Sequence, residues 1–170
     1  MLIVEFTVLF CLGLICYQDL RYRAVYWLCF PVLAALLFFM KQQAAGTSAA
    51  LIDAGIATVF FAVQLLLVWL YFSFKNKKPV NITVQYLGLG DILFLMALAF
   101  YLSPLNYVLF YVSSLIVVLC YTIIQRSLNK DAGPEIPLAG LQALLLGCLL
   151  FFSMIKPGLN PYTDAWAYGL

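Results

Sequence analysis

The sequence predicts an all-α integral membrane protein that crosses the bilayer with six helices. The 170-residue chain is 66% hydrophobic and only 9% charged, whereas soluble domains carry about 25% charged residues. Its apolar residues also gather in six segments, most of them near the ~20 residues that a helix needs to cross a bilayer. We expect each segment to be helical, because a helix satisfies its own backbone polar groups within lipid.

The six segments follow one another closely, so we expect a single domain over residues 1–170. Its helices are expected at residues 1–17, 25–40, 50–74, 86–102, 104–125 and 137–155. The second and fourth are short for a membrane crossing and need flanking residues or a thinner bilayer. The first should be a retained helix, since Glu5 stands where a secretory signal has basic residues.

Polar or turn-forming residues end each segment in turn. The breaks are Gln18–Arg23, Lys41–Ser48, Lys75–Pro79, Ser103–Pro104, Gln125–Glu135 and Lys156–Gly158. A short tail follows the last break and contains Tyr162, Trp166 and Tyr168. Aromatic side chains of this kind are typical of a membrane interface.

The nine Lys and Arg residues are divided unevenly between the two sides of the predicted membrane. Lys41 and Lys156 lie on one side. The other seven lie in the loops after the first, third and fifth helices: Arg21, Arg23, Lys75, Lys77, Lys78, Arg126 and Lys130. Because basic residues accumulate in cytoplasmic loops, we expect both termini outside and these loops in the cytoplasm.

A net charge of +2 gives no indication of nucleic-acid binding.

Two acidic residues stand at the ends of apolar segments, where a carboxylate is costly and usually functional. Asp19 closes the first segment, and Asp91 begins the fourth within Gly88-Leu89-Gly90-Asp91. The predicted topology places both at the cytoplasmic ends of their helices, at one membrane depth. Asp53 and Glu5 fall on the outer side, so they are not expected to join this pair.

Two carboxylates held close in a poorly solvated site share a proton, since both cannot ionise cheaply. The ionised carboxylate can take a proton from water while the protonated one polarises a carbonyl, as in aspartic proteases. The pair therefore predicts amide hydrolysis without a metal or another cofactor. The chain has no histidine, which excludes Ser-His-Asp triads. Its five cysteines form no C-x-x-C pair and are interpreted as small buried hydrophobes.

The glycines beside the second acid have two interpretations. Gly88 and Gly90 would permit an irregular or closely packed backbone, which an extended substrate strand could approach. The alternative is small-residue packing between helices, which is common in membranes. Their position just before Asp91 favours the first interpretation.

Four other residues are candidates for substrate or topology contacts. Arg21 and Arg23 are expected to determine topology, with attraction of an acidic or lipid-associated segment as the alternative. Gln142 follows Pro137 by little more than one turn, at the cytoplasmic end of the last helix. Its side chain could face the two acids, although a hydrogen bond between helices is favoured.

These motifs resemble those of the type IV prepilin peptidases. Asp19-Leu20-Arg21-x-Arg23-x-Val25 with Trp27 resembles their first aspartate motif, and Gly88-Leu89-Gly90-Asp91 matches their GxGD motif. Ile136–Ala143 is more loosely similar to the proline- and glycine-bearing segment that begins their last helix. The resemblance covers essentially the whole chain and implies a membrane aspartyl endopeptidase with Asp19 and Asp91 as catalytic residues.

The resemblance also implies the substrate and the location. Such enzymes remove short basic leader peptides from type IV prepilins, pseudopilins or Flp-type pilins at the cytoplasmic face of the bacterial inner membrane. These substrates carry an apolar helix behind the cleavage site and must enter laterally from the bilayer. The expected partners are therefore a prepilin-like membrane protein and lipid, with no nucleic acid.

The sequence departs from the family pattern at several points. Tyr26 stands where many members have proline, and Leu93 stands where many have a lysine that contacts substrate or tunes a pKa. The cysteine-bearing region linked to metal binding and N-methylation is missing, so we expect cleavage without methyl transfer. Presenilin-type proteases also use GxGD, but they are longer, and Pro-Leu-Ala replaces their Pro-Ala-Leu here.

Two other functions would fit the composition. A small proton- or ion-coupled transporter also uses acids inside the membrane. Transporters often show internal repeats and paired broken helices, and neither pattern is evident in this sequence. A non-catalytic membrane scaffold would explain the composition but neither aspartate motif.

Overall fold

The computed structural model describes residues 2–78, 88–128, 137–156, 160–164 and 166. These residues form helices and no strand, which confirms the all-α prediction for this part of the chain. The six helices are α1 (Leu2–Tyr22), α2 (Cys29–Ala45), α3 (Thr47–Asn76), α5 (Leu89–Leu98), α6 (Pro104–Leu128) and α7 (Leu138–Ile155).

Four of these helices, α1, α3, α6 and α7, are long and apolar enough to cross a membrane. The other two are shorter, with 17 residues in α2 and 10 in α5. A 10-residue helix rises only about 15 Å, roughly half the thickness of the hydrocarbon core. The segment predicted at 86–102 is therefore a short helix followed by a turn at residues 99–102.

The helices α1 and α2 end at Tyr22 and Ala45, each five residues later than hydropathy predicted, whereas α3 and α6 end only two or three residues later than predicted. The helix expected to end at residue 17 continues to Tyr22, so Asp19 lies inside α1. The break expected at Lys41–Ser48 is confined to Gly46, which separates α2 from α3 with a φ of 87°. Lys41 lies within α2 because its side chain is fully buried and paired there, as described below.

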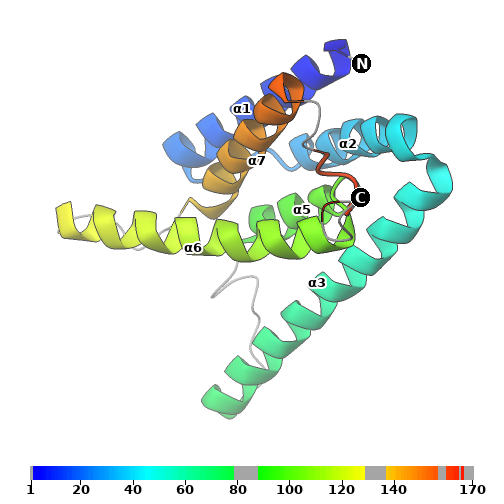
Figure 1. The fold of residues 1–170 in the computed structure, drawn as a ribbon. Helices are drawn as coiled ribbons and strands as arrows, with labels where there is room; N and C mark the ends of the chain where they lie inside the picture. Colours follow the sequence, from blue (N-terminus) through cyan, green and yellow to red (C-terminus); the bar gives the residue numbers. More distant parts are fainter. Residues whose placement is uncertain (1, 79–87, 129–136, 157–159, 165, 167–170) are drawn as a thin grey trace.

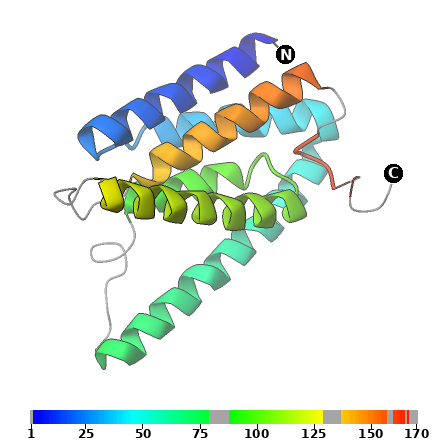
Figure 2. The same cartoon turned by 60° about the vertical axis from the view of Figure 1, so that its left-hand side comes forward.

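The helices α1 and α7 lie side by side along much of their length and run in opposite directions (Figures 1 and 2). The helix α2 packs against α1, α3 and α5. The second half of α3 extends away from the other helices in both views. All the buried residues of α3 precede residue 62. The hydrophobic core therefore forms mainly between the remaining helices.

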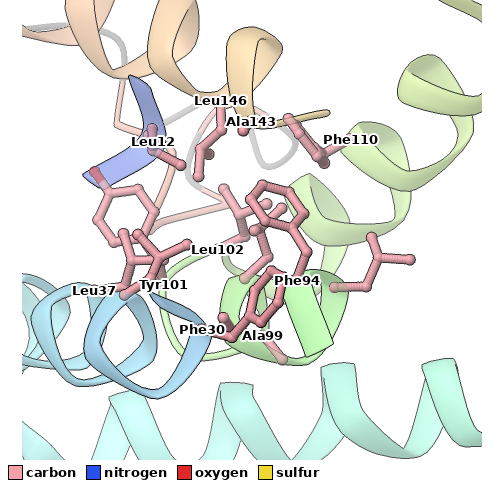
Figure 3. Close-up of a cluster of buried hydrophobic side chains, with 14 of the residues drawn as sticks. Leu12, Phe30, Leu37, Phe94, Ala99, Tyr101, Leu102, Phe110, Ala143 and Leu146 are labelled. Atoms are coloured by element: carbon pink, nitrogen blue, oxygen red, sulfur yellow. The ribbon is translucent and has the colours of Figure 1, made fainter. Parts of the chain in front are cut away.

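Figure 3 shows how this core is assembled. In this view Leu12 of α1, Leu146 of α7 and Phe110 of α6 lie above Phe94 of α5 and Phe30 of α2, and all five belong to one core cluster. Each of these five side chains is buried. The core holds the start of α7 against the C-terminal end of α1 and the start of α5.

A separate polar cluster lies around the turn between α5 and α6. Lys41 Nζ donates to the carbonyl oxygen of Leu102 at 3.0 Å and pairs with Asp53 Oδ2 at 2.8 Å. The Ser103 hydroxyl donates to the Asp164 carboxylate in the tail after α7. This cluster connects α2, α3, the turn and the tail.

Candidate active site

Asp19 lies in the last turn of α1 and points toward the beginning of α7. Its Oδ2 atom accepts a hydrogen bond of 2.6 Å from the backbone N–H of Gly140. Gly140 is the third residue of α7, where a backbone N–H has no partner within its own helix. The carboxylate thus satisfies an unpaired donor at the positively polarised end of a helix.

The helices α1 and α7 approach so closely here that Gly140 has no room for a side chain. A Cβ atom at this position would lie 3.0 Å from both Cβ and Oδ2 of Asp19. Such a contact is too short to be accepted without a shift of Asp19 or of the backbone. Gly140 therefore allows the short hydrogen bond and the close helix crossing together.

Asp91 reaches the same end of α7 from the first turn of α5. The backbone amides of Ala139 and Gly88 favour the charged form of its carboxylate, and the Asp19 carboxylate acts on it electrostatically. Adjacent residues of α7 therefore act on the two carboxylates, Ala139 on that of Asp91 and Gly140, through a hydrogen bond, on that of Asp19. The structure brings the two predicted aspartates together at one helix N-terminus.

The two glycines of the GxGD motif have different surroundings. A Cβ atom at Gly88 would lie 3.1 Å from Oδ2 of Asp91, whereas one at Gly90 would meet only the Phe30 ring, at 3.5 Å. Gly88 has an extended backbone with φ −64° and ψ 141°. Neither glycine uses the left-handed conformation, so Gly88 contributes space beside the carboxylate rather than an unusual backbone.

The four other predicted site residues lie around this pair in different ways. Arg21 and Arg23 are exposed at the end of α1, and Arg23 also acts electrostatically on Asp19. Pro137 is buried at the N-cap of α7. Gln142 is fully buried and donates from Nε2 to Ser114 Oγ of α6 at 3.1 Å, which is the interhelical hydrogen bond that the sequence favoured.

Sequence reasoning missed the two amide donors, Ala139 and Gly140. The sequence does carry a signal for them, a proline followed by small residues, which marks the start of a helix. The free backbone N–H groups at a helix start can bind an anion such as a carboxylate. From the sequence, both residues belong only to Ile136–Ala143, the segment with the looser family resemblance.

Among the residues that the structure describes, no group of three or more His, Cys, Asp or Glu side chains could hold a metal ion.

The arrangement brings two carboxylates together beside a hydrophobic core. The backbone amide of Gly140 binds the Asp19 carboxylate, and that of Ala139 acts on the Asp91 carboxylate. An ionised carboxylate in this place can accept a proton from water, and a protonated one can donate a hydrogen bond to a carbonyl oxygen. This is the pair of roles that hydrolysis of a peptide bond requires.

Comparison with known proteins identifies the family of the chain. A search of curated proteins and a search of solved structures each found no significant match to the chain. A family model described as the type IV leader peptidase family matches residues 6–124, a range that contains Asp19 and Asp91 and ends before α7. Together with the apolar helices, the match indicates a multi-pass membrane peptidase. It confirms the predicted resemblance, and the chain belongs to the type IV leader peptidase family.

Proposed function

We propose that the protein is an aspartic-type endopeptidase that removes leader peptides from prepilin-like membrane proteins. Asp19 and Asp91 would be its catalytic residues, and the reaction would take place at the cytoplasmic face of a bacterial inner membrane. The observation that carries the proposal is the meeting of both carboxylates at the start of α7, where Gly140 binds Asp19 and Ala139 lies beside Asp91. The match to a peptidase family supports hydrolysis over ion transport.

The proposed reaction uses one ionised and one protonated carboxyl group. The ionised carboxylate takes a proton from a water molecule, whose oxygen attacks the scissile carbonyl carbon. The protonated carboxyl group donates a hydrogen bond to the carbonyl oxygen as negative charge develops there. When the C–N bond breaks, the leaving amine takes a proton from the pair, and the two products are a carboxylic acid and an amine.

Several finer features belong to this proposal. The substrate would be a type IV prepilin, a pseudopilin or a Flp-type pilin with a short leader peptide. The reaction would need no metal or other cofactor, because the two carboxyl groups perform both proton transfers. The enzyme would cleave without methylating the new N-terminus, since the chain lacks the paired cysteines associated with that activity.

The proposal is tested by co-expressing a candidate prepilin with wild-type protein, Asp19→Asn or Asp91→Asn. We expect the wild type to shorten the prepilin by the mass of its leader, and each variant to leave it intact. Glu5→Gln is a control, because Glu5 lies in the first turn of α1, at the opposite end of that helix from Asp19. Unchanged cleavage by both Asp19→Asn and Asp91→Asn would disprove the proposed mechanism.

A further inference from the structure

A groove runs between α1 and α7 beside the carboxylate pair. Its volume is about 590 Å³. Its lining includes Leu9, Gly13 and Tyr17 from α1 and Ala143, Gly147 and Phe151 from α7, and none of its lining residues is charged. In the two ribbon views α1 and α7 lie next to each other along this length (Figures 1 and 2).

One end of the groove lies about one helical turn from Asp19. The lining residues Cys16 and Ala143 each lie three residues, or about one helical turn, from Asp19 and Gly140 respectively. From there the groove extends along α1 as far as Leu9. The groove therefore leads from the carboxylate pair along the apolar surface of the molecule.

Two glycines that line this groove, Gly13 and Gly147, have open space beside them. A Cβ atom at Gly13 or Gly147 would have no atom within 4 Å. At Gly140, by contrast, the contact between α1 and α7 excludes a side chain. Because small residues on a helix surface allow another helix to approach closely, the empty space at Gly13 and Gly147 suits an additional helix.

We propose that this groove binds the apolar helix of the protein substrate, with the helix end that follows the scissile bond lying at Asp19. This inference rests on the proposed function and names the surface that receives its substrate. The end of the groove at Cys16 and Ala143, one turn from Asp19 and Gly140, favours a substrate helix over a lipid chain, because a helix bound there would bring its own end toward the carboxylates. The uncharged lining suits entry from the surrounding bilayer.

The first test fills the groove with Gly147→Leu. Since Gly147 has open space around it, the larger side chain should be accepted by the fold. Gly55→Leu is the matched control, because Gly55 of α3 also has nothing within 4 Å and does not line the groove. Each protein is assayed on a substrate with its apolar helix and on a short peptide with the same cleavage sequence but no helix.

We expect Gly147→Leu to lower kcat/KM for the helical substrate about tenfold or more, because it removes apolar contacts along the groove. Cleavage of the short peptide should not change, and Gly55→Leu should cleave both substrates normally. Equal effects of Gly147→Leu on both substrates, or no effect on either, would overturn the groove assignment. If the wild type cleaves neither substrate, the proposed function itself fails and the assignment falls with it.

The second test uses native cysteines and does not depend on cleavage of the short peptide. Cys148 is exposed and lines the groove, whereas Cys120 of α6 is exposed outside it. Single cysteines are placed along the substrate helix and oxidised in the presence of the Asp91→Asn variant. Because Cys16 also lines the groove, the experiment is done in a Cys16→Ser background, in which we expect disulfides that are lost on Cys148→Ser and retained on Cys120→Ser. Crosslinks that persist without Cys148 and vanish without Cys120 would place the substrate elsewhere.

Discussion

At the scale of single residues, the position of Asp19 depends on the absence of a side chain at Gly140. We expect Gly140→Ala to lower kcat at least tenfold with little change in KM, because the added Cβ would lie 3.0 Å from the carboxylate and displace it. Misplacement of a reacting group by about 1 Å can cost a factor of about 100 in rate. Single-turnover cleavage at saturating enzyme measures the effect.

Gly55→Ala is the control for this substitution, since it adds the same methyl group to a helix, α3, with nothing within 4 Å and outside the groove. It should cleave at the wild-type rate. Equal activity of Gly140→Ala and Gly55→Ala would show that the approach of α7 to Asp19 does not limit catalysis.

The two glycines of the GxGD motif should also differ in their tolerance of a methyl group. We expect Gly88→Ala to reduce kcat, because its Cβ would lie 3.1 Å from Oδ2 of Asp91. Gly90→Ala should keep most activity, because its Cβ would make an ordinary contact of 3.5 Å with the Phe30 ring. Steady-state cleavage by the two variants measures the difference, and the reverse order of activity would contradict the assignment of Gly88.

At the scale of helices, burial determines which charged residues stay within a helix. Lys41 Nζ is fully buried between Asp53 and the carbonyl oxygen of Leu102. Removing one member of a buried ion pair typically costs about 3–5 kcal/mol. We expect the loss of stability caused by Lys41→Met to lie near the lower end of this range. The unpaired Asp53 side chain is 24% exposed and can still be solvated by water.

The change in stability can be measured by denaturant unfolding in detergent. Lys41→Met combined with Asp53→Asn should recover part of the loss, since the double variant leaves no unpaired carboxylate. If Lys41→Met were as stable as the wild type, the ion pair would not contribute to the connection between α2 and α3.

The helices themselves were largely predictable, because apolar length and polar breaks are local properties of the sequence. The ends of α1 and α2 were not, since they depend on partners distant in the chain. Asp19 stays in α1 beside Gly140, 121 residues away, and Lys41 stays in α2 beside the carbonyl of Leu102, 61 residues away. A single sequence shows that both charges are unusual but does not identify the atoms that satisfy them.

At the scale of the whole molecule, the expected orientation can be tested by labelling. In a cysteine-free background, Lys77→Cys should react with a membrane-impermeant thiol reagent only after the cells are permeabilised. Gln43→Cys, at an exposed site near the other end of α3, should react in intact spheroplasts. These outcomes follow from the excess of basic residues in the predicted cytoplasmic loops, and the opposite pattern would reverse the orientation.

The dependence of both carboxylates on α7 has a consequence for synthesis of the chain. Asp19 and Asp91 emerge from the ribosome well before Ala139 and Gly140, whose backbone amides act on the two carboxylates in the finished fold. A nascent chain that has not yet reached α7 carries both acids but neither of these amides. We therefore expect the carboxylate pair to take its final arrangement only after translation has delivered α7.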